Sequence, residues 1–279
     1  MMKRCALYPF LLFAGIATAV AFAEEWPAAL QHTHAHNDYE HPRPLQDALD
    51  NGFYSIEADI WLVDEDLLVG HDEGIYKGTL RDLYLDPLQK RVNERGSVHG
   101  DGKPVLLWLD LKDGRPALRS ALHTLLSQYP MLSRFSEEKT VPKAVTLILT
   151  GNAQSKMADG SDYPIRFDCA DSNDFSPDDP DASVHWQWYA LKWGSYIQWD
   201  GVESIPAETL EKLKAIVNAI HAKGRKVRFY ATPETPGYWQ TALEVGIDLI
   251  NTDQLKELRQ FLQNRSQPGD SGDQPKDME

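Results

Sequence analysis

The sequence has very little cysteine. Its 279 residues include two, Cys5 and Cys169. Cys5 falls in a segment that we expect to be removed, so the mature chain would keep Cys169 alone and could form no internal disulfide bond. No nucleophile motif surrounds Cys169, which argues against a catalytic thiol. The stability of the fold must come from a hydrophobic core, and an apolar content of 42% is sufficient for one.

The sequence also lacks a surplus of positive charge. It has 28 Lys and Arg residues against 42 Asp and Glu residues, which gives a formal net charge of −14. Proteins that bind nucleic acids normally carry a basic patch or stripe, so this balance argues against DNA or RNA as a partner. A protein with this net charge would need a local region of positive charge to bind an anionic phosphate substrate, and a bound cation would supply it.

No apolar stretch is long enough for a bilayer-spanning helix of about 20 residues. One apolar run, 8–22, follows Lys3 and Arg4 and closes on an Ala-Phe-Ala pattern at 21–23. A charged start, a short apolar run and small residues at the exit are typical of a secretory signal peptide. We predict cleavage before Glu24 and export to a periplasm or out of the cell, with no membrane span left. The alternative is an uncleaved N-terminal anchor.

The rest of the chain contains neither a low-complexity linker nor an internal repeat. The stretch 265–279 is rich in Ser, Gln, Pro, Gly and Asp, and we expect a disordered tail there. Between these ends we expect a single domain, 24–264, in which strand-like and helix-like stretches alternate. Such alternation indicates a parallel sheet, and seven or eight units in this length favour an α/β fold closed as a (β/α)8 TIM barrel.

The least regular pattern lies in 153–192, to which we assign no element. The expected strands are 31–37, 53–61, 105–112, 145–150, 196–199, 227–230 and 247–251. The expected helices are 44–50, 115–129, 238–245 and one that begins at Pro206 and ends at Gly224.

Carboxylates end two of the expected strands. Glu57 and Asp59 share one face of their strand, and Asp110 and Lys112 come last on the polar face of another, because side chains alternate in direction. Barrel active sites lie at the C-terminal end of the strands. Three converging acids need a cation, and oxygen ligands select a hard metal such as Mg²⁺ or Ca²⁺. The alternative is a solvated pair of acids, or a salt bridge with Lys112.

Histidines accompany these acids. His32, His34 and His36 alternate along the first expected strand, and His36 lies nearest its C-terminal end. A short return strand before His71 would carry that residue back to the mouth of the barrel. Histidine can take and give a proton near neutral pH, so His36 and His71 could form an acid/base pair. The alternative for each is an ordinary core or surface histidine.

Taken in order, these motifs resemble the signature of glycerophosphodiester phosphodiesterases. The wider group is the phospholipase-C-like phosphodiesterase superfamily, and the opening His-x-His-Asn-Asp-Tyr is most similar to its "altered inheritance of mitochondria" branch. The resemblance covers nearly the whole mature chain. It rests on His36-Asn37-Asp38, Pro44-Leu45 with Ala48-Leu49 and Gly52, Ile56-Glu57-Ala58-Asp59, Val69-Gly70-His71-Asp72, Asp110-Leu111-Lys112 and the closing strand 246–253.

The resemblance implies a TIM barrel and a metal-dependent phosphodiester hydrolase acting on glycerophosphodiesters or phospholipid head groups. Attack by water and attack by a substrate hydroxyl, which would give a cyclic phosphate, both fit. The implied roles are His36 and His71 as the acid/base pair, Glu57, Asp59 and Asp110 as ligands of Mg²⁺ or Ca²⁺, and Lys112 and Asn37 at the phosphate.

Two positions depart from that signature. Asn37 stands where an arginine usually follows the first histidine, which affects one phosphate contact. Asp110 stands in place of a glutamate, which shortens the reach to a metal. The reaction class is compatible with both changes, whereas the usual glycerophosphodiester substrate is less firmly implied.

Two other functions remain open on the residues alone. His34-Ala35-His36 matches the His-x-His of metal-dependent amidohydrolases, which are barrels too; that function needs two further histidines at later strand ends, with Asp253 as the acid. The six aromatic residues between 186 and 199 could instead form a sugar- or lipid-binding surface on an inactive barrel, although core packing is the more common role of such residues.

Overall fold

The structure is a computed structural model that describes residues 30–152, 156 and 163–266. The expected signal peptide, 1–23, lies outside these residues. The last helix ends at Ser266, and the remainder of the expected tail lies outside the described residues as well. None of the helices in the described part combines the length and the apolarity needed to cross a membrane.

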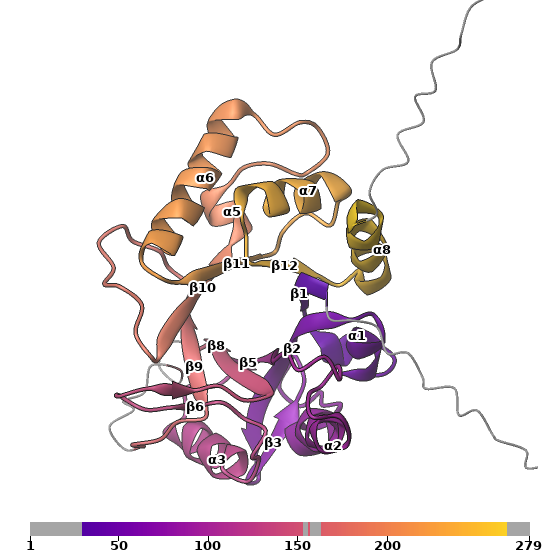
Figure 1. The fold of residues 1–279 in the computed structure, drawn as a ribbon. Helices are drawn as coiled ribbons and strands as arrows, with labels where there is room; N and C mark the ends of the chain where they lie inside the picture. Colours follow the sequence, from indigo (N-terminus) through magenta and orange to yellow (C-terminus); the bar gives the residue numbers. More distant parts are fainter. Residues whose placement is uncertain (1–29, 153–155, 157–162, 267–279) are drawn as a thin grey trace, which may run out of the picture.

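Eight parallel strands close into a ring, with helices around the outside (Figure 1). The first strand pairs with both the last and the second, and this closes the sheet. The expected single-domain (β/α)8 barrel is confirmed. In order around the ring the strands are β1 (Leu30–Ala35), β2 (Phe53–Val63), β5 (Val105–Leu111), β8 (Val145–Gly151), β9 (Asp168–Ser172), β10 (Trp186–Lys192), β11 (Lys226–Tyr230) and β12 (Leu249–Thr252).

Two short strands extend the ring at β2. β3 (Asp66–Val69) pairs antiparallel with the end of β2, and β4 (Gly78–Thr79) pairs antiparallel with β3. A separate pair joins β6 (Arg134–Phe135) to β7 (Thr140–Val141). The helical elements are η1 (Asp38–Glu40), α1 (Gln46–Asp50), η2 (Arg81–Leu85), α2 (Asp86–Arg95), α3 (Pro116–Leu126), α5 (Trp193–Tyr196), α6 (Ala207–Ala222), α7 (Pro236–Val245) and α8 (Leu255–Ser266).

The long helices follow the sequence closely. In α6 the fully buried side chains are Leu213, Val217 and Ile220, whose spacing places them on one face. α7 begins after Thr235, whose side-chain oxygen accepts a hydrogen bond from the Tyr238 backbone N–H. Each helix therefore presents an apolar stripe to the strands and a polar face to solvent.

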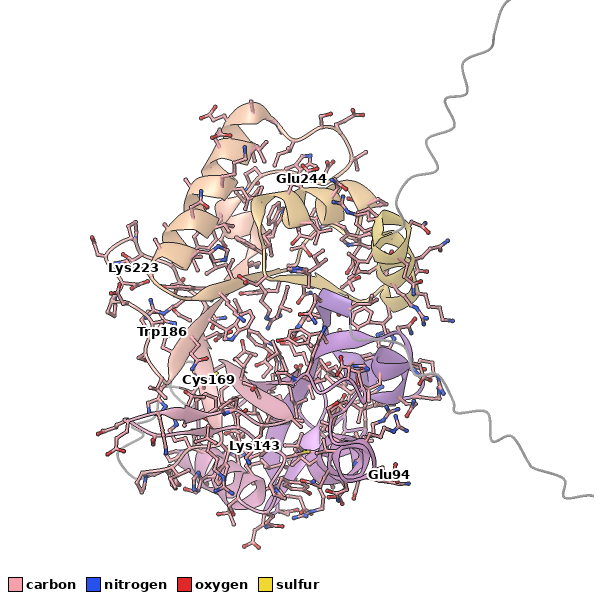
Figure 2. The ribbon with its side chains drawn as sticks, viewed as in Figure 1. Glu94, Lys143, Cys169, Trp186, Lys223 and Glu244 are labelled. Carbon is pink, nitrogen blue, oxygen red and sulfur yellow. The ribbon has the colours of Figure 1, made fainter. Side chains whose placement is uncertain are left out.

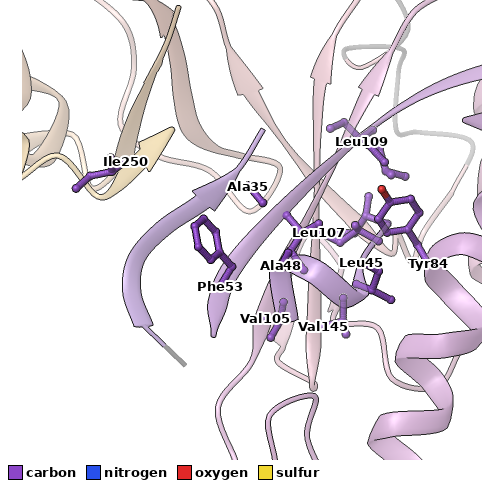
Figure 3. Close-up of a cluster of buried hydrophobic side chains, with 14 of the residues drawn as sticks. Ala35, Leu45, Ala48, Phe53, Tyr84, Val105, Leu107, Leu109, Val145 and Ile250 are labelled. Atoms are coloured by element: carbon purple, nitrogen blue, oxygen red, sulfur yellow. The ribbon is translucent and has the colours of Figure 1, made fainter. Parts of the chain in front are cut away.

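Strand alternation divides the core into two layers. Between the strands and the helices, residues such as Ala35, Ala48 and Leu107 pack together (Figure 3). Side chains also fill the inside of the ring (Figure 2). Trp108, Cys169 and Trp188 belong to this inner cluster and are almost completely buried. The barrel is thus a packed core, and functional residues are confined to its ends.

Three expectations about the strands were wrong in detail. No strand covers 196–199; β10 lies earlier, and α5 follows it directly. β9 falls in the region without an assignment, because its two aspartates give it a polar sequence. At the start of β2 the alternation is reversed, since Phe53 packs in the outer layer and Tyr54 against the inner cluster.

Candidate active site

Three acidic side chains meet at the C-terminal end of the barrel. Asp59 on β2 lies opposite Asp110 on β5 in the strand register, and Glu57 is two residues before Asp59 on the same face. Glu57, Asp59 and Asp110 each offer one carboxylate oxygen, and these oxygens lie within 4.8 Å of one another. Strand alternation had predicted this grouping.

Gly151, at the end of β8, makes room for one of these acids. A Cβ atom at this position would lie 1.8 Å from Asp110 Oδ1, and the backbone φ of +81° is one that side chains rarely tolerate. The Asp110 carboxylate therefore occupies space that only glycine leaves open.

The three carboxylates fit a hard divalent cation. Asp59 Oδ1 is buried and has no hydrogen-bond partner among the described residues, so an acceptor remains unused inside the cluster. Burial and the neighbouring charges of Asp110 and Glu57 raise the pKa of Asp59 to about 6. A bound cation would favour the ionised form of Asp59, because an opposite charge nearby stabilises a carboxylate. Carboxylate oxygens are also the ligands that Mg²⁺ and Ca²⁺ prefer.

Glu57 is held at both of its oxygens. Oε2 lies 2.8 Å from His34 Nε2, and Oε1 lies 3.0 Å from a terminal nitrogen of Arg228. Burial opposes ionisation of this carboxyl, but Arg228 and His34 outweigh it and lower the pKa of Glu57. Burial and Arg228 lower the pKa of His34 to about 4, so its ring is neutral at pH 7 and donates Nε2–H to Glu57. The other ring nitrogen lies 2.8 Å from the Ser55 hydroxyl.

Lys112 joins two of the acids. Its Nζ lies 2.7 Å from Asp59 Oδ2 and 2.8 Å from Asp110 Oδ2. Burial disfavours the ammonium ion, but the two carboxylates outweigh that effect and raise the pKa of Lys112. The salt bridge considered as an alternative from the sequence is therefore present, and it leaves Glu57 and Asp59 Oδ1 outside it.

His36 is oriented by a carboxylate from the other end of the chain. Its Nδ1 lies 2.9 Å from Asp253 Oδ1, just after β12. The Asp253 backbone N–H donates in turn to Glu234, at 3.0 Å. Burial acts to lower the pKa of His36, but Asp253 and Glu57 outweigh it, and the pKa of this histidine is raised. Nε2 is left as the ring nitrogen available for proton transfer.

A cavity of about 330 Å³ opens among these groups. Each of its lining residues except Gly151 has a polar side chain, and they come from β1, β2, β5, β8, β9 and β11 or the loops that follow them. The lining residues are His36, Glu57, Asp110, Thr150, Gly151, Asn173, Arg228 and Tyr230.

The structure does not bring the His71 ring into this lining. The expected return strand is β3, and the Gly70 backbone N–H beside it donates to the Asp59 carbonyl at 3.1 Å. The His71 side chain itself is 58% exposed and contacts Asp72 at 3.0 Å. Asn37 is also absent from the lining; it adopts a left-handed backbone conformation, with φ of 44°, and begins η1.

Sequence analysis missed Arg228 and several uncharged residues of the cavity. The available signal for Arg228 was its alternation in β11 with Val227 and Phe229, both of which pack in the outer layer. An arginine on the inner face of a barrel strand is unusual because a buried charge needs a partner. The bond between His36 and Asp253 gave no local signal, since 217 positions separate them.

The amidohydrolase alternative finds no support in the described residues. Their only candidate metal cluster of three or more ligand-type residues is made of Glu57, Asp59 and Asp110 and contains no histidine. His185 lies just before β10, at the opposite end of that strand from the mouth. His221 lies on α6, where it contacts Asp248 at 2.9 Å.

The aromatic residues between 186 and 199 are mainly part of the core. Trp188, Tyr189 and Trp193 are at most 4% exposed. The remaining three pack against the same core and are partly buried. This arrangement gives little free aromatic surface for a sugar or a lipid.

Comparisons with known proteins agree with this architecture. A family model described as an AIM6-like phosphodiesterase domain matches residues 28–163. The "Altered inheritance of mitochondria protein 6 homolog" of Arthroderma benhamiae is 28% identical over 264 residues, with 82% of this chain and 83% of the relative covered. The resemblance predicted from the motifs is confirmed. The chain is thus similar to the altered-inheritance-of-mitochondria proteins.

A second relative, from Lachancea thermotolerans, is 28% identical over 278 residues, with 81% of this chain and 64% of the relative covered. The chain thus spans less than two thirds of that protein. A glycerophosphodiester phosphodiesterase from Parabacteroides distasonis has a similar structure, with a TM-score of 0.54, 16% identity and coverage of 86% of this chain and 100% of that one. A glycerophosphodiester phosphodiesterase from Agrobacterium tumefaciens has a TM-score of 0.52 and 15% identity, with coverage of 83% of this chain and 99% of that one. At these identities the structural likeness supports the fold alone.

Proposed function

We propose that this chain is an exported, metal-dependent phosphodiester hydrolase that acts on glycerophosphodiesters or phospholipid head groups. The observation that carries the proposal is the cluster of Glu57, Asp59 and Asp110 at a cavity that is also lined by His36, a histidine held by Asp253. The phosphodiesterase description of the family model supports the reaction class.

The proposed metal is Mg²⁺ or Ca²⁺, held by Glu57, Asp59 and Asp110. When bound, it would neutralise negative charge on the phosphoryl oxygens. Lys112 would add to this, because an ammonium group has three N–H donors and Asp59 and Asp110 take two of them. The third is available to a phosphate oxygen.

His36 is the proposed general base. With Asp253 accepting a hydrogen bond from Nδ1–H, Nε2 can take a proton from an attacking water or substrate hydroxyl. We assign protonation of the leaving alcohol to His71. The backbone N–H of its neighbour Gly70 donates a hydrogen bond to the Asp59 carbonyl, which holds this segment beside the acids. The exposed His71 ring would have to turn from Asp72 toward the bound substrate.

The test is metal-dependent turnover on a panel of phosphodiesters that includes glycerophosphocholine, glycerophosphoinositol, phosphatidylinositol and lysophospholipids. We expect turnover that a chelator, His36→Ala or Glu57→Ala abolishes. The matched control is His221→Ala, because His221 and Asp248 form a His–Asp pair of the same 2.9 Å length away from the mouth. Absence of turnover on every substrate, together with no metal binding by the purified protein, would overturn the proposal.

Export is tested separately. We expect the protein recovered from the periplasm or medium of its host to begin at Glu24, as determined by N-terminal sequencing. Recovery of an intact N-terminus would favour the membrane-anchor alternative.

A further inference from the structure

Arg228 is a buried cation whose side chain lines the active-site cavity. It lies on the inner face of β11 and is 2% exposed, yet it lines the same cavity as His36 and Asp110. Placing an arginine inside a barrel costs desolvation free energy, so its retention there requires compensating contacts. These contacts also determine which way its N–H groups point.

The protein holds this guanidinium in place but accepts hydrogen bonds from only some of its N–H groups. One terminal nitrogen donates to Asn251 Oδ1 at 2.7 Å and the other donates to Glu57 Oε1 at 3.0 Å. The guanidinium carbon lies 4.4 Å from the centre of the Trp108 ring, which restricts the plane of the group. Of the five N–H groups of an arginine, these contacts use two, and Nε is buried without a partner.

A positively charged group at the cavity favours the binding of an anion. Its lining includes the carboxylates of Glu57 and Asp110, with Asp59 close by, and the whole chain carries a charge of −14. Among the described residues, Arg228 is the one lysine or arginine in that lining. Lys112 is engaged by two carboxylates on the side of the acids.

We propose that Arg228 binds the phosphate group of the substrate directly, with N–H groups that Asn251 and Glu57 leave free. This inference rests on the proposed function and adds a substrate contact to it. Arg228 then has two tasks: it holds Glu57 in place, and it donates to phosphate oxygens in a preset plane. A guanidinium suits the second task because its donors match the oxygens of a phosphate.

The competing explanation is that Arg228 serves only as the counterion of Glu57. Both explanations predict that its removal harms folding and activity, so activity alone cannot separate them. Binding of inorganic phosphate can, because a simple counterion of Glu57 makes no contact with the anion.

The experiment measures the affinity of the full chain for inorganic phosphate by calorimetry, with Mg²⁺ at a concentration that a separate titration shows to be saturating for each variant. We expect Arg228→Gln to weaken phosphate binding roughly tenfold to a hundredfold, as expected for loss of charge-assisted hydrogen bonds, and Arg228→Lys to restore part of it. Arg225→Gln is the control. Arg225 is also 2% exposed and stacks on Trp186 at 3.7 Å, but it donates to the backbone carbonyls of the segment around residues 180–186.

A second measurement needs no variant. In a crystal structure of the unaltered protein with Mg²⁺ and phosphate, we expect a phosphate oxygen within hydrogen-bond distance of the Arg228 guanidinium. Equal phosphate affinity in Arg228→Gln and the unaltered protein, no phosphate binding at all, or phosphate in the cavity without contact to Arg228 would each overturn the inference. The proposed function is judged independently by turnover, so turnover with unchanged phosphate affinity would reject the Arg228 contact alone.

Discussion

At the scale of single residues, the site depends on two histidines with opposite surroundings. His34 is completely buried between Ser55 and Glu57, and its pKa is lowered to about 4 by burial and by Arg228. His36 lies at the cavity, and its pKa is raised because Asp253 and Glu57 outweigh burial. Two histidines only two positions apart thus acquire different tasks: His34, on β1, positions a carboxylate, whereas His36, just after β1, is placed to exchange a proton.

The first prediction concerns the partner of His36. Asp253→Asn removes the carboxylate that orients this ring and raises its pKa, so we expect kcat/KM to fall by about 100-fold or more, as for other histidines that lose an orienting acid. The neutral ring is the active base. A lower pKa therefore moves the acid limb of the pH–rate profile to lower pH. Asp248→Asn, at the remote His221 pair, should change neither quantity, and an unshifted acid limb in Asp253→Asn would contradict the assignment.

A second prediction concerns Asp38, whose carboxyl is buried next to the first strand. Burial raises its pKa to about 6, although the Leu45 backbone N–H and the Tyr84 hydroxyl donate to it. The folded protein then binds a proton more tightly than the unfolded chain does. Its contribution therefore lowers the free energy of unfolding as pH rises from about 4 to about 6, and this loss persists above pH 6.

Asp38→Asn removes this titration. We expect the variant to gain in relative stability over the same interval, by at most about 3 kcal/mol, since one pKa unit corresponds to about 1.4 kcal/mol. Urea unfolding of both proteins from pH 4 to pH 7 provides the measurement. The lowered pKa of His34 makes the free energy of unfolding rise with pH, but it does so equally in both proteins. The difference in free energy of unfolding between the two proteins therefore reports on Asp38 alone. A difference independent of pH would contradict the prediction.

At the scale of secondary structure, alternation along a strand is a local property, so the sequence was sufficient to place Glu57, Asp59 and Asp110 at one mouth. The same reasoning failed for β9, because its aspartates are buried by distant partners. Asp168 is paired with Arg119 at 3.0 Å, and Asp171 lies 2.6 Å from Lys156. Arg166 also contacts Asp168 at 2.9 Å from two residues away, but Arg119 and Lys156 come from other segments, and no local pattern indicates those contacts.

The same limit explains what was missed at the site. The contacts of His34 with Glu57, of His36 with Asp253 and of Arg228 with Glu57 all cross between strands that the closed ring brings together. The sequence predicted the ring and the residues that end its strands. Which of those residues touch depends on strand register and on bulges such as the one near His32, where φ is 68°.

The end of β8 provides a test at this scale. Gly151→Ala would place a methyl group against the Asp110 carboxylate, so we expect Mg²⁺ affinity to fall by at least roughly tenfold, in line with the loss of one metal-ligand contact. Gly96→Ala, after α2, is the matched control, because its φ of +79° is nearly the same and nothing lies within 4 Å of the added carbon. Both variants should lose about 1 kcal/mol of stability from backbone strain. Equal Mg²⁺ affinity in the two would show that Asp110 does not ligate the metal.

At the scale of the whole molecule, the barrel closes by pairing its first strand with its last. β1 carries His34 and is followed by His36, β12 carries Asn251 and is followed by Asp253, and the two strands are paired. The site is therefore completed only when the entire ring has formed. Stability and site assembly are coupled here without any disulfide bond, since Cys169 is the one cysteine in the described chain and is free.

This coupling gives a last prediction, for the stability of the entire domain. A metal that binds only the folded ring stabilises it by mass action, by about 2.7 kcal/mol when the free ion is at 100 times its Kd. In a domain of this size we expect the melting temperature to rise by roughly 5 to 10 °C on addition of saturating Mg²⁺ or Ca²⁺ and to return on chelation. Asp110→Asn should abolish the rise. Asp82→Asn, which alters an acid hydrogen-bonded to Thr79 on the outer surface, should leave it intact. The metal site would be rejected if the unaltered protein melted at the same temperature with and without both ions. A series of ion concentrations, with NaCl at matched ionic strength as the control, separates occupancy of the three carboxylates from a general effect of salt.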